Sequence, residues 1–241
     1  MQVGFKTDRG SKRAVNEDAL FVMPKQQIYI VADGVGGHNS GELASRTAVA
    51  SIAVYIDQNP IPQTATSQEL KGYFLECLRV VNMKIFTMSQ AEDENKGMAT
   101  TVVLAYIVEN VAYVVNVGDS RAYLVRQTIM EQVTEDHSYV NELVKSGKIT
   151  HEEAIVHPER NKITRALGAA KHVLPDFYKI QVVKEDVICL CSDGLYNEVS
   201  KRQMCDMISS IPTMSALADE LVNLANENGG SDNITLICVK I

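Results

Sequence analysis

Three apolar, β-branched segments follow one another between residues 99 and 126, with very little chain between them. They cover residues 99–108, 111–117 and 120–126, and only Glu109 and Asn110 separate the first two. Connections this short join antiparallel strands, because a parallel pair needs a crossover of a dozen or more residues. The order of these segments therefore predicts an antiparallel sheet and disfavours a doubly wound parallel sheet.

Helices are expected in pairs on either side of this strand-rich centre. Apolar residues recur with helical spacing in residues 41–56 and 69–89, and again near residues 200–209 and in residues 214–226. Further strands are predicted at residues 27–32, 187–191 and 234–241. The pattern indicates an α+β chain in which helices cover antiparallel sheets. One large domain and two small ones are equally compatible with the length of 241 residues.

The stretch from residue 136 to residue 172 has a different character, since it is rich in charge and histidine. We expect a surface subdomain inserted between core strands, and long insertions of this kind often cover a functional site. The histidines of this stretch have no metal-type spacing and are predicted to lie on its surface: His137, His151, His157 and His172.

Composition excludes several classes of protein. The formal net charge of -7 argues against a general nucleic-acid binder, which needs a basic face. No apolar run approaches the ~20 residues of a membrane span, and the first residues do not resemble a signal peptide. Cys77, Cys189, Cys191, Cys205 and Cys238 lack C-x-x-C spacing, so we interpret them as small buried residues of a reducing compartment. A soluble, cytoplasmic protein is expected.

Four aspartates lie in glycine- or serine-flanked turns at the edges of apolar runs: Asp33, Asp119, Asp193 and Asp232. If their strands share one core, the strand ends gather the carboxylates at one rim, where their pKa values rise unless a cation neutralises them. One such aspartate is more often an ordinary turn residue. Four without a Cys or His cluster indicate an all-oxygen site for Mg²⁺ or Mn²⁺, which the Gly34 carbonyl can join, and hydrolytic chemistry.

Residues nearer the N-terminus allow two interpretations each. Arg13, Glu17 and Asp18 are either a solvated charge run or a site in which the arginine forks onto a phosphoryl group and the acids hold metal-bound waters. The glycine-rich residues 34–37 lack the lysine of a P-loop and the glycine order of a dinucleotide site, so we interpret them as steric clearance. His38 is either a proton donor to a leaving group or a solvated loop histidine.

Taken together, these residues resemble the ordered motifs of the metal-dependent serine/threonine protein phosphatases, the PPM family or type 2C, in its compact bacterial form. The resemblance runs in order over essentially the whole chain. The motifs are Arg13 with Asn16-Glu17-Asp18, Val31-Ala32-Asp33-Gly34-Val35-Gly36-Gly37-His38, Gly97-Met98-Ala99-Thr100-Thr101, Val117-Gly118-Asp119-Ser120-Arg121-Ala122, Thr134-Glu135-Asp136-His137-Ser138, Ile163-Thr164-Arg165-Ala166-Leu167-Gly168, Cys191-Ser192-Asp193-Gly194-Leu195 and Gly230-Ser231-Asp232-Asn233-Ile234-Thr235.

The resemblance implies a four-layer α-β-β-α sandwich of two mainly antiparallel sheets, formed by one catalytic domain over residues 1–241 with a helical flap at about residues 139–168. It also implies two tightly bound Mn²⁺ or Mg²⁺ ions and a weaker third. By this resemblance Asp33 bridges the first two ions, and the Gly34 carbonyl, Asp193 and Asp232 bind them as well. Asp119 is implied to bind the third ion. Glu17 and Asp18 are implied to lie behind these ligands, and Arg13 to bind the substrate phosphate. One departure is that eukaryotic members have histidine directly after Asp-Gly, whereas here further glycines precede His38.

The implied activity is hydrolysis of phosphoserine and phosphothreonine by attack of a water that bridges the metals, with Arg13, Asp33 and Asp193 as catalytic residues. The expected partners are phosphorylated proteins, substrates of a serine/threonine kinase, with no nucleic acid or membrane, and the chain is expected to be a monomer. Two alternatives are a hydrolase of small phosphoesters that uses the same metals and a non-catalytic phosphoprotein-binding module. The second should have lost a metal aspartate, and all are present.

Overall fold

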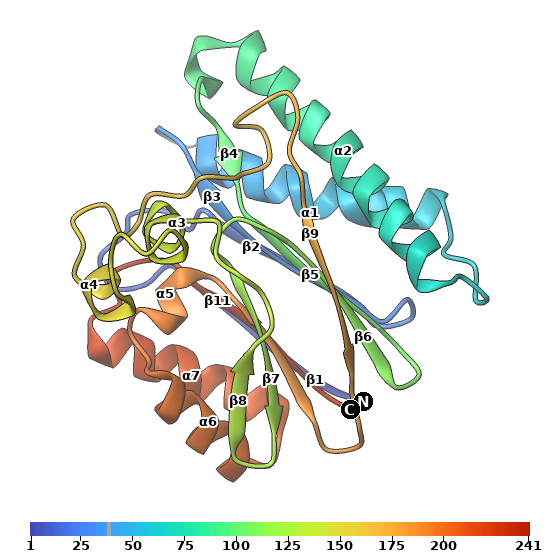
Figure 1. Ribbon diagram of the computed structural model, residues 1–241, viewed down its shortest axis with the longest axis vertical. Helices are drawn as coiled ribbons and strands as arrows, with labels where there is room; N and C mark the ends of the chain where they lie inside the picture. Colours follow the sequence, from blue (N-terminus) through green and yellow to red (C-terminus); the bar gives the residue numbers. More distant parts are fainter. Residues whose placement is uncertain (38–39) are drawn as a thin grey trace.

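Two antiparallel sheets lie face to face in the structure, a computed structural model that describes residues 1–37 and 40–241, and helices cover the outer face of each sheet (Figure 1). The first sheet has the order β1 (Gln2–Asp8), β11 (Ile234–Lys240), β10 (Val187–Cys191), β7 (Arg121–Arg126) and β8 (Ile129–Gln132). The second has the order β2 (Asp18–Met23), β3 (Ile28–Val35), β5 (Val102–Val108), β6 (Val111–Val117) and β9 (Asp176–Gln181), with β4 (Ala99–Thr100) beside β3.

The long helices form the outer two layers. The pair α1 (Ser40–Gln58) and α2 (Ser67–Ala91) packs on the second sheet, and the pair α6 (Lys201–Ser210) and α7 (Met214–Asn228) packs on the first. Short helices occupy Asp93–Asn95 (η1), Tyr139–Lys145 (α3), His151–Ile155 (α4) and Asp193–Tyr196 (α5). The four-layer α-β-β-α sandwich expected from the sequence is confirmed.

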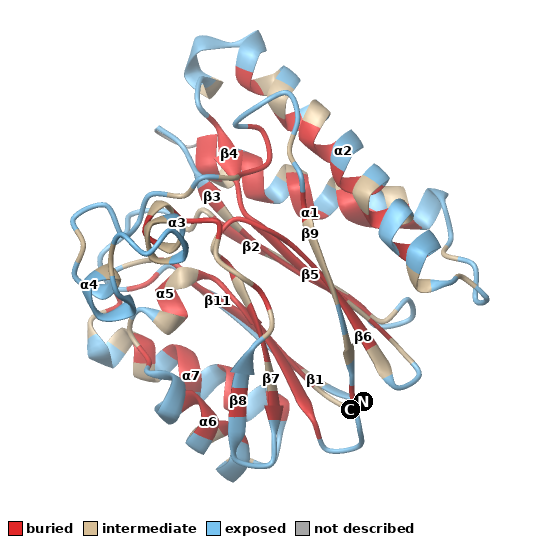
Figure 2. Cartoon of the chain, in the orientation of Figure 1, coloured by how far each residue is buried: buried red, intermediate tan, exposed pale blue. Residues whose placement is uncertain are grey.

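Apolar side chains fill the space between the sheets and beneath each helical layer. The buried positions, red in Figure 2, accordingly follow the strands and the helix faces turned toward them. Between the sheets, Val31 and Val114 of the second sheet share a cluster with Ile188 and Ile237 of the first. All four are fully buried, and burial of such a side chain stabilises the fold by about 1.5–3 kcal/mol relative to exposure. The β-branched runs form strands here because a pleated surface with both faces covered suits their shape.

Polar caps fix where the helices begin. Thr66 accepts a hydrogen bond from the backbone N–H of Glu69, whose side chain in turn accepts from the backbone N–H of Thr66, which is a capping box at the start of α2. Ser200 and Gln203 form the same arrangement at the start of α6. Each capping box therefore gives a partner to two of the backbone N–H groups at the start of its helix.

Several strand predictions need correction. Strands β1, β2, β8 and β9 were not expected, because most of their residues are half-buried or exposed and they lie at or next to the sheet edges. The strand predicted to end before Asp33 continues to Val35, since β4 pairs with its last two residues. The strand predicted over residues 99–108 is divided at Thr101, whose backbone and side chain both bond to Asp33.

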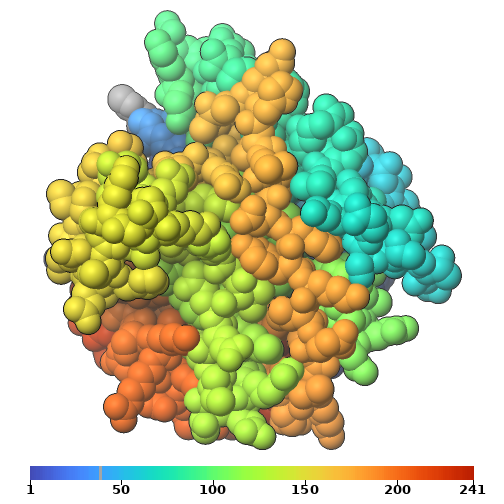
Figure 3. Space-filling view, in the orientation of Figure 1, coloured from blue at the N-terminus to red at the C-terminus, as the bar shows by residue number. Residues whose placement is uncertain are grey.

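The insert after Ser138 carries the short helices α3 and α4 and forms a lobe on the surface, the yellow segment in Figure 3. Its two ends meet where Ser138 and Ile163 form an isolated β-bridge. No described helix is long and apolar enough to cross a membrane. The five cysteines all lie in the described part of the chain, where each is a buried free thiol as expected.

Candidate functional site

The acidic residues singled out from the sequence converge at one end of the two sheets. Asp18 and Asp33 are direct partners in the pairing of β2 with β3, Asp193 begins α5 after β10, and Asp232 precedes β11, the neighbour of β10. Asp119 lies between β6 and β7, where the chain crosses from one sheet to the other. Burial raises the pKa of Asp33 well above its ordinary value, and the charges of the other four acids raise it further, so all five lie near one another.

Four of these carboxyls, those of Asp18, Asp33, Asp119 and Asp193, are costly to ionise. Burial, followed by the charges of Asp193 and Asp232, raises the pKa of Asp18 to about 7, although hydrogen bonds from Ser192 and Thr235 oppose the rise. Burial and the charge of Asp193 raise the pKa of Asp119 to about 7. Burial and the charge of Asp232 raise the pKa of Asp193 to about 6. Buried acids whose pKa values are raised in this way form a site that a cation would neutralise.

Two threonines hold the backbone of Asp33. The backbone N–H of Asp33 donates to Thr101 Oγ1 at 3.0 Å, and its carbonyl accepts from the N–H of Thr101 at 2.8 Å and from Thr100 Oγ1 at 2.9 Å. Thr101 Oγ1 also lies 2.6 Å from Ser120 Oγ, next to Asp119. The sequence analysis included Thr101 in a motif but assigned it no role, because its contact with Asp33 spans 68 positions.

The acids behind the cluster are anchored by residues from the other sheet. The backbone N–H of Glu17 donates to Asn233 Oδ1 at 2.8 Å, and Asp18 Oδ2 accepts from Ser192 Oγ at 2.7 Å. Their remaining oxygens, Glu17 Oε1 and Asp18 Oδ1, are buried without a hydrogen-bond partner. Buried carboxylate oxygens without a partner are costly, so both are suited to a ligand that brings positive charge or water. Asn233, which also donates to the carbonyl of Val15, was included in a sequence motif but assigned no role.

Backbone packs closely around Gly34. A Cβ on this residue would lie 2.0 Å from the carbonyl oxygen of Gly41 and 2.6 Å from that of Glu17, and a Cβ on Gly41 would lie 2.5 Å from Glu17 Oε1. Any side chain at either glycine would therefore displace the backbone or the carboxylate of Glu17. This observation supports the steric explanation of the glycines near Asp33.

Arg13 reaches the same end of the sheets from the loop between β1 and β2. Its Nη2 donates to Asp232 Oδ2 at 2.7 Å, and its side chain remains about half exposed at 49%. The arginine thus stands at the solvent side of the acid cluster with guanidinium donors still open to solution.

The donor set fits hard cations. Among residues 1–37 and 40–241, no three Asp, Glu, His or Cys side chains are already arranged so that they could hold a metal ion, and Asp232 is paired with Arg13. The carboxylates that gather here nevertheless repel one another, Glu17 and Asp18 each have a partnerless oxygen, and the surrounding donors are oxygen atoms. Oxygen ligands in this number suit Mg²⁺ and Mn²⁺.

Comparison with known proteins identifies the family to which this arrangement belongs. A family model described as Protein phosphatase 2C matches residues 16–234, which include every acid of the cluster. The chain belongs to the protein phosphatase 2C family. Its members are metal-dependent, in agreement with the oxygen-rich donor set.

Relatives of this phosphatase 2C chain are similar over their full lengths. The serine/threonine phosphatase stp of Listeria innocua is 39% identical over 243 residues, which cover 100% of this chain and 96% of that protein. The crystal structure of the phosphatase Stp1 from Staphylococcus aureus has a TM-score of 0.92 at 35% identity and covers 100% and 95% of the two chains. The catalytic domain of phosphatase PstP in complex with two manganese ions has a TM-score of 0.86 at 32% identity, over 99% and 97%.

One prediction for the histidines of this phosphatase 2C chain is wrong. His137 is not on the surface of the insert, because its side chain is 5% exposed and its ring contacts Gly118 and Asp176. Tertiary packing places it beneath the insert, whereas His151 and His172 are exposed and His157 is half-buried. His38, a candidate proton donor, lies outside the described residues.

Proposed function

We propose that the acid cluster is the active site of a metal-dependent protein phosphatase that hydrolyses phosphoserine and phosphothreonine. The observation that carries the proposal is the convergence of Asp18, Asp33, Asp119, Asp193 and Asp232, each from a different segment, at one end of the protein phosphatase 2C fold. Bound Mn²⁺ or Mg²⁺ supplies Lewis-acid stabilisation of a phosphoryl group and lowers the pKa of water.

The proposed roles follow from where each residue lies. Asp33 pairs with Asp18 across the two strands and the charges of all four other acids act on it, so it would hold cations at the centre of the site. The Gly34 carbonyl, Asp193 and Asp232 would hold the more tightly bound cations together with Asp33, and Asp119 would hold a weaker third one. Glu17 and Asp18 stand behind these ligands with one partnerless oxygen each, so we assign them to holding coordinated waters.

Arg13 is the proposed substrate-binding residue. Its guanidinium lies at the exposed edge of the cluster, where a phosphoryl group would enter, and a planar fork of donors suits two phosphate oxygens. Its bond to Asp232 holds the side chain in this position before a substrate arrives. Arg13 then stabilises negative charge on the phosphoryl oxygens as water attacks phosphorus.

Phosphoproteins are the substrates that this activity requires. We further propose that a serine/threonine kinase supplies them, that residues 1–241 act as one catalytic unit with residues 139–168 as its flap, and that the protein works in the cytoplasm as a monomer. The five buried free thiols support a reducing compartment, and the net charge of -7 supports the absence of a nucleic-acid partner.

The proposal is tested with phosphoserine, phosphothreonine and phosphotyrosine peptides and a small aryl phosphate, each with Mn²⁺, Mg²⁺ or a chelator. We expect hydrolysis of the phosphoserine and phosphothreonine peptides with either metal and none with the chelator. Hydrolysis of the aryl phosphate alone would instead support the small-phosphoester alternative. A folded protein that cleaves no substrate with either metal would refute the assignment.

A further inference from the structure

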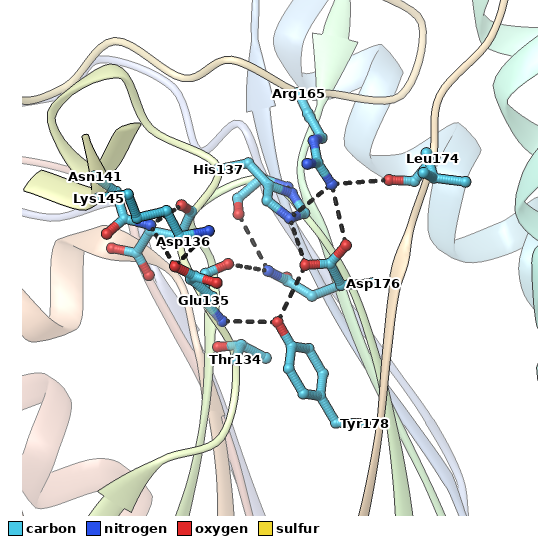
Figure 4. A network of polar contacts seen from close by, with 12 residues as sticks. Thr134, Glu135, Asp136, His137, Asn141, Lys145, Arg165, Leu174, Asp176 and Tyr178 are labelled. Carbon is cyan, nitrogen blue, oxygen red and sulfur yellow. Dashed lines mark hydrogen bonds and ion pairs between the residues drawn. The ribbon is translucent and has the colours of Figure 1, made fainter. Parts of the chain in front are cut away.

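His137 is buried at the junction of three segments: the root of the flap, the start of β9, and the turn that carries Asp119 (Figure 4). Its side chain touches no residue of the acid cluster, and the proposed mechanism does not use it. Both ring nitrogens of this buried histidine have polar partners. Those partners indicate which segments the side chain holds together.

The Nδ1 side of the ring holds the Gly118 turn. The backbone N–H of Gly118 donates to His137 Nδ1 at 3.0 Å, and the backbone N–H of His137 donates to the Gly118 carbonyl at 3.0 Å. Gly118 has a positive φ of 105°, and a Cβ there would lie 2.6 Å from the side chain of Thr101. The residue before Asp119 thus has a backbone conformation that favours glycine, and His137 forms hydrogen bonds with both its N–H and its carbonyl.

The Nε2 side of the ring holds the flap to the second sheet. His137 Nε2 lies 3.2 Å from Asp176 Oδ2, at the start of β9, and Arg165 Nη1 donates to Asp176 Oδ1 at 3.1 Å. The carbonyl of His137 accepts from the N–H of Thr164 at 2.8 Å, so both ends of the flap meet at this point. Tyr178 also donates to Asp176 Oδ2, at 3.2 Å.

These contacts determine the tautomer of the ring. Because Nδ1 accepts from a backbone N–H, the single proton of the neutral ring lies on Nε2, which donates to Asp176. Arg165 Nη1 lies 3.1 Å from the same nitrogen and adds positive charge beside it. Burial lowers the pKa of His137, and Arg165 lowers it further, while Asp176 opposes both, so the neutral ring is the form that the site favours.

We propose that His137 is a positioning residue with two separable tasks: its Nδ1 fixes the Gly118–Asp119 turn, and its Nε2 fixes the flap to β9. This inference rests on the proposed function for its link to catalysis, because it assigns the first task to turnover and the second to capture of a phosphopeptide beneath the flap. The tie to the turn acts through the backbone of Gly118, the residue before Asp119.

Two isosteric substitutions separate these tasks. In His137→Asn the amide oxygen is separated from the backbone by the same number of bonds as histidine Nδ1. This variant therefore keeps the contact with Gly118 and loses the contact with Asp176. In His137→Gln the amide nitrogen stands as many bonds away as Nε2, so the contact with Asp176 is kept and that with Gly118 is lost. His172→Gln and His172→Asn, at an exposed histidine, are the matched controls.

The readouts are amide exchange by NMR and steady-state kinetics on a phosphoserine peptide and an aryl phosphate. For His137→Gln we expect the Gly118 N–H to exchange about tenfold faster, as a lost hydrogen bond of this kind implies, and kcat to fall on both substrates with the peptide KM unchanged. For His137→Asn we expect faster exchange at the Thr164 N–H and a raised peptide KM, with kcat on the aryl phosphate kept. The His172 variants should match the wild type in every readout.

Equal changes in the two His137 variants, or none in either, would overturn the inference, because a merely structural histidine would not separate turnover from capture. If either variant fails to fold, the ¹⁵N spectrum of the wild-type imidazole decides: the Nε2–H tautomer supports the assignment, and an Nδ1–H tautomer or an imidazolium at neutral pH overturns it. If the wild-type protein were inactive on both substrates, the proposed function would be refuted. The amide-exchange measurements would still test whether His137 holds the turn and the flap.

Discussion

Arg13 donates a 2.7 Å hydrogen bond to Asp232, a residue 219 positions away. The contact joins the residue proposed to bind phosphate to a residue proposed to bind metal, and it closes the loop between β1 and β2 over the acid cluster. The two side chains are 49% and 31% exposed, so solvent and salt weaken the pair. Its role is therefore more to orient Arg13 than to stabilise the fold.

Replacing Arg13 should chiefly weaken substrate capture. For Arg13→Ala we expect KM for a phosphopeptide to rise about ten- to a hundredfold with a smaller fall in kcat, because a charge-assisted hydrogen bond to phosphate is lost. Arg13→Lys keeps the charge without the fork and should give an intermediate KM. Steady-state kinetics decide the matter, and Lys12→Ala, at an exposed neighbour, is the control. An unchanged KM in Arg13→Ala would show that the side chain does not reach the substrate.

Loss of Asp33 or Asp193 should nearly abolish turnover in a protein that stays folded. Each change removes a proposed metal ligand, and we expect kcat to fall by more than about a thousandfold, since several kcal/mol of charge stabilisation is lost. Circular dichroism and metal titration of Asp33→Ala and Asp193→Ala provide the measurements, with Asp57→Ala on the exposed face of α1 as control. Activity close to that of the wild type in either variant would rule out the proposed ligand set.

Stability of the metal-free protein should decrease as pH rises from about 4 to about 7. The pKa values of Asp18 and Asp119 are raised from 3.8 to about 7, so over this interval the folded protein binds more protons than the unfolded chain. The free energy of unfolding then falls with pH, which is the sign that linkage requires. Excess Mn²⁺ should reverse the trend, because the cation binds the ionised carboxylates.

Urea unfolding in the presence of a chelator, repeated across this pH interval, measures the effect. Asp33→Asn is the informative control, since it removes one charge from the cluster and should flatten the dependence. A free energy of unfolding that rises over the same interval in the metal-free wild type would contradict the prediction.

Thr101 should prove to be a supporting residue of the site. Thr101→Val has nearly the same shape but leaves the buried N–H of Asp33 without its acceptor, so we expect a loss of about 1–3 kcal/mol in stability and reduced kcat. Thr101→Ser keeps the hydroxyl and should retain most of both. Thermal unfolding and kinetics on an aryl phosphate test this pair, and equal behaviour of the two variants would show that the hydroxyl has no such role.

The sequence alone was enough to predict the central strands and the long helices. Residues 111–117 and 187–191 are continuous apolar runs, and α2 has a helical stripe of apolar residues together with its capping box. Such patterns are local, because a short run of consecutive residues is enough to show the side-chain period of a strand or helix. The aspartates could be predicted for a similar reason, because each stands in a short motif beside such a run.

Tertiary structure alone decided the contacts that join these motifs. The edge strand β9 forms because β6 offers it a partner, His137 is buried because the flap folds over it, and Thr101 meets Asp33 because β4 pairs with the end of β3. Each contact depends on which residues the sheet register brings opposite one another, and register is fixed by the packing of the whole core rather than by neighbours in the chain. For that reason the acids proposed as ligands could be singled out from the sequence, whereas the residues that hold them in place could not.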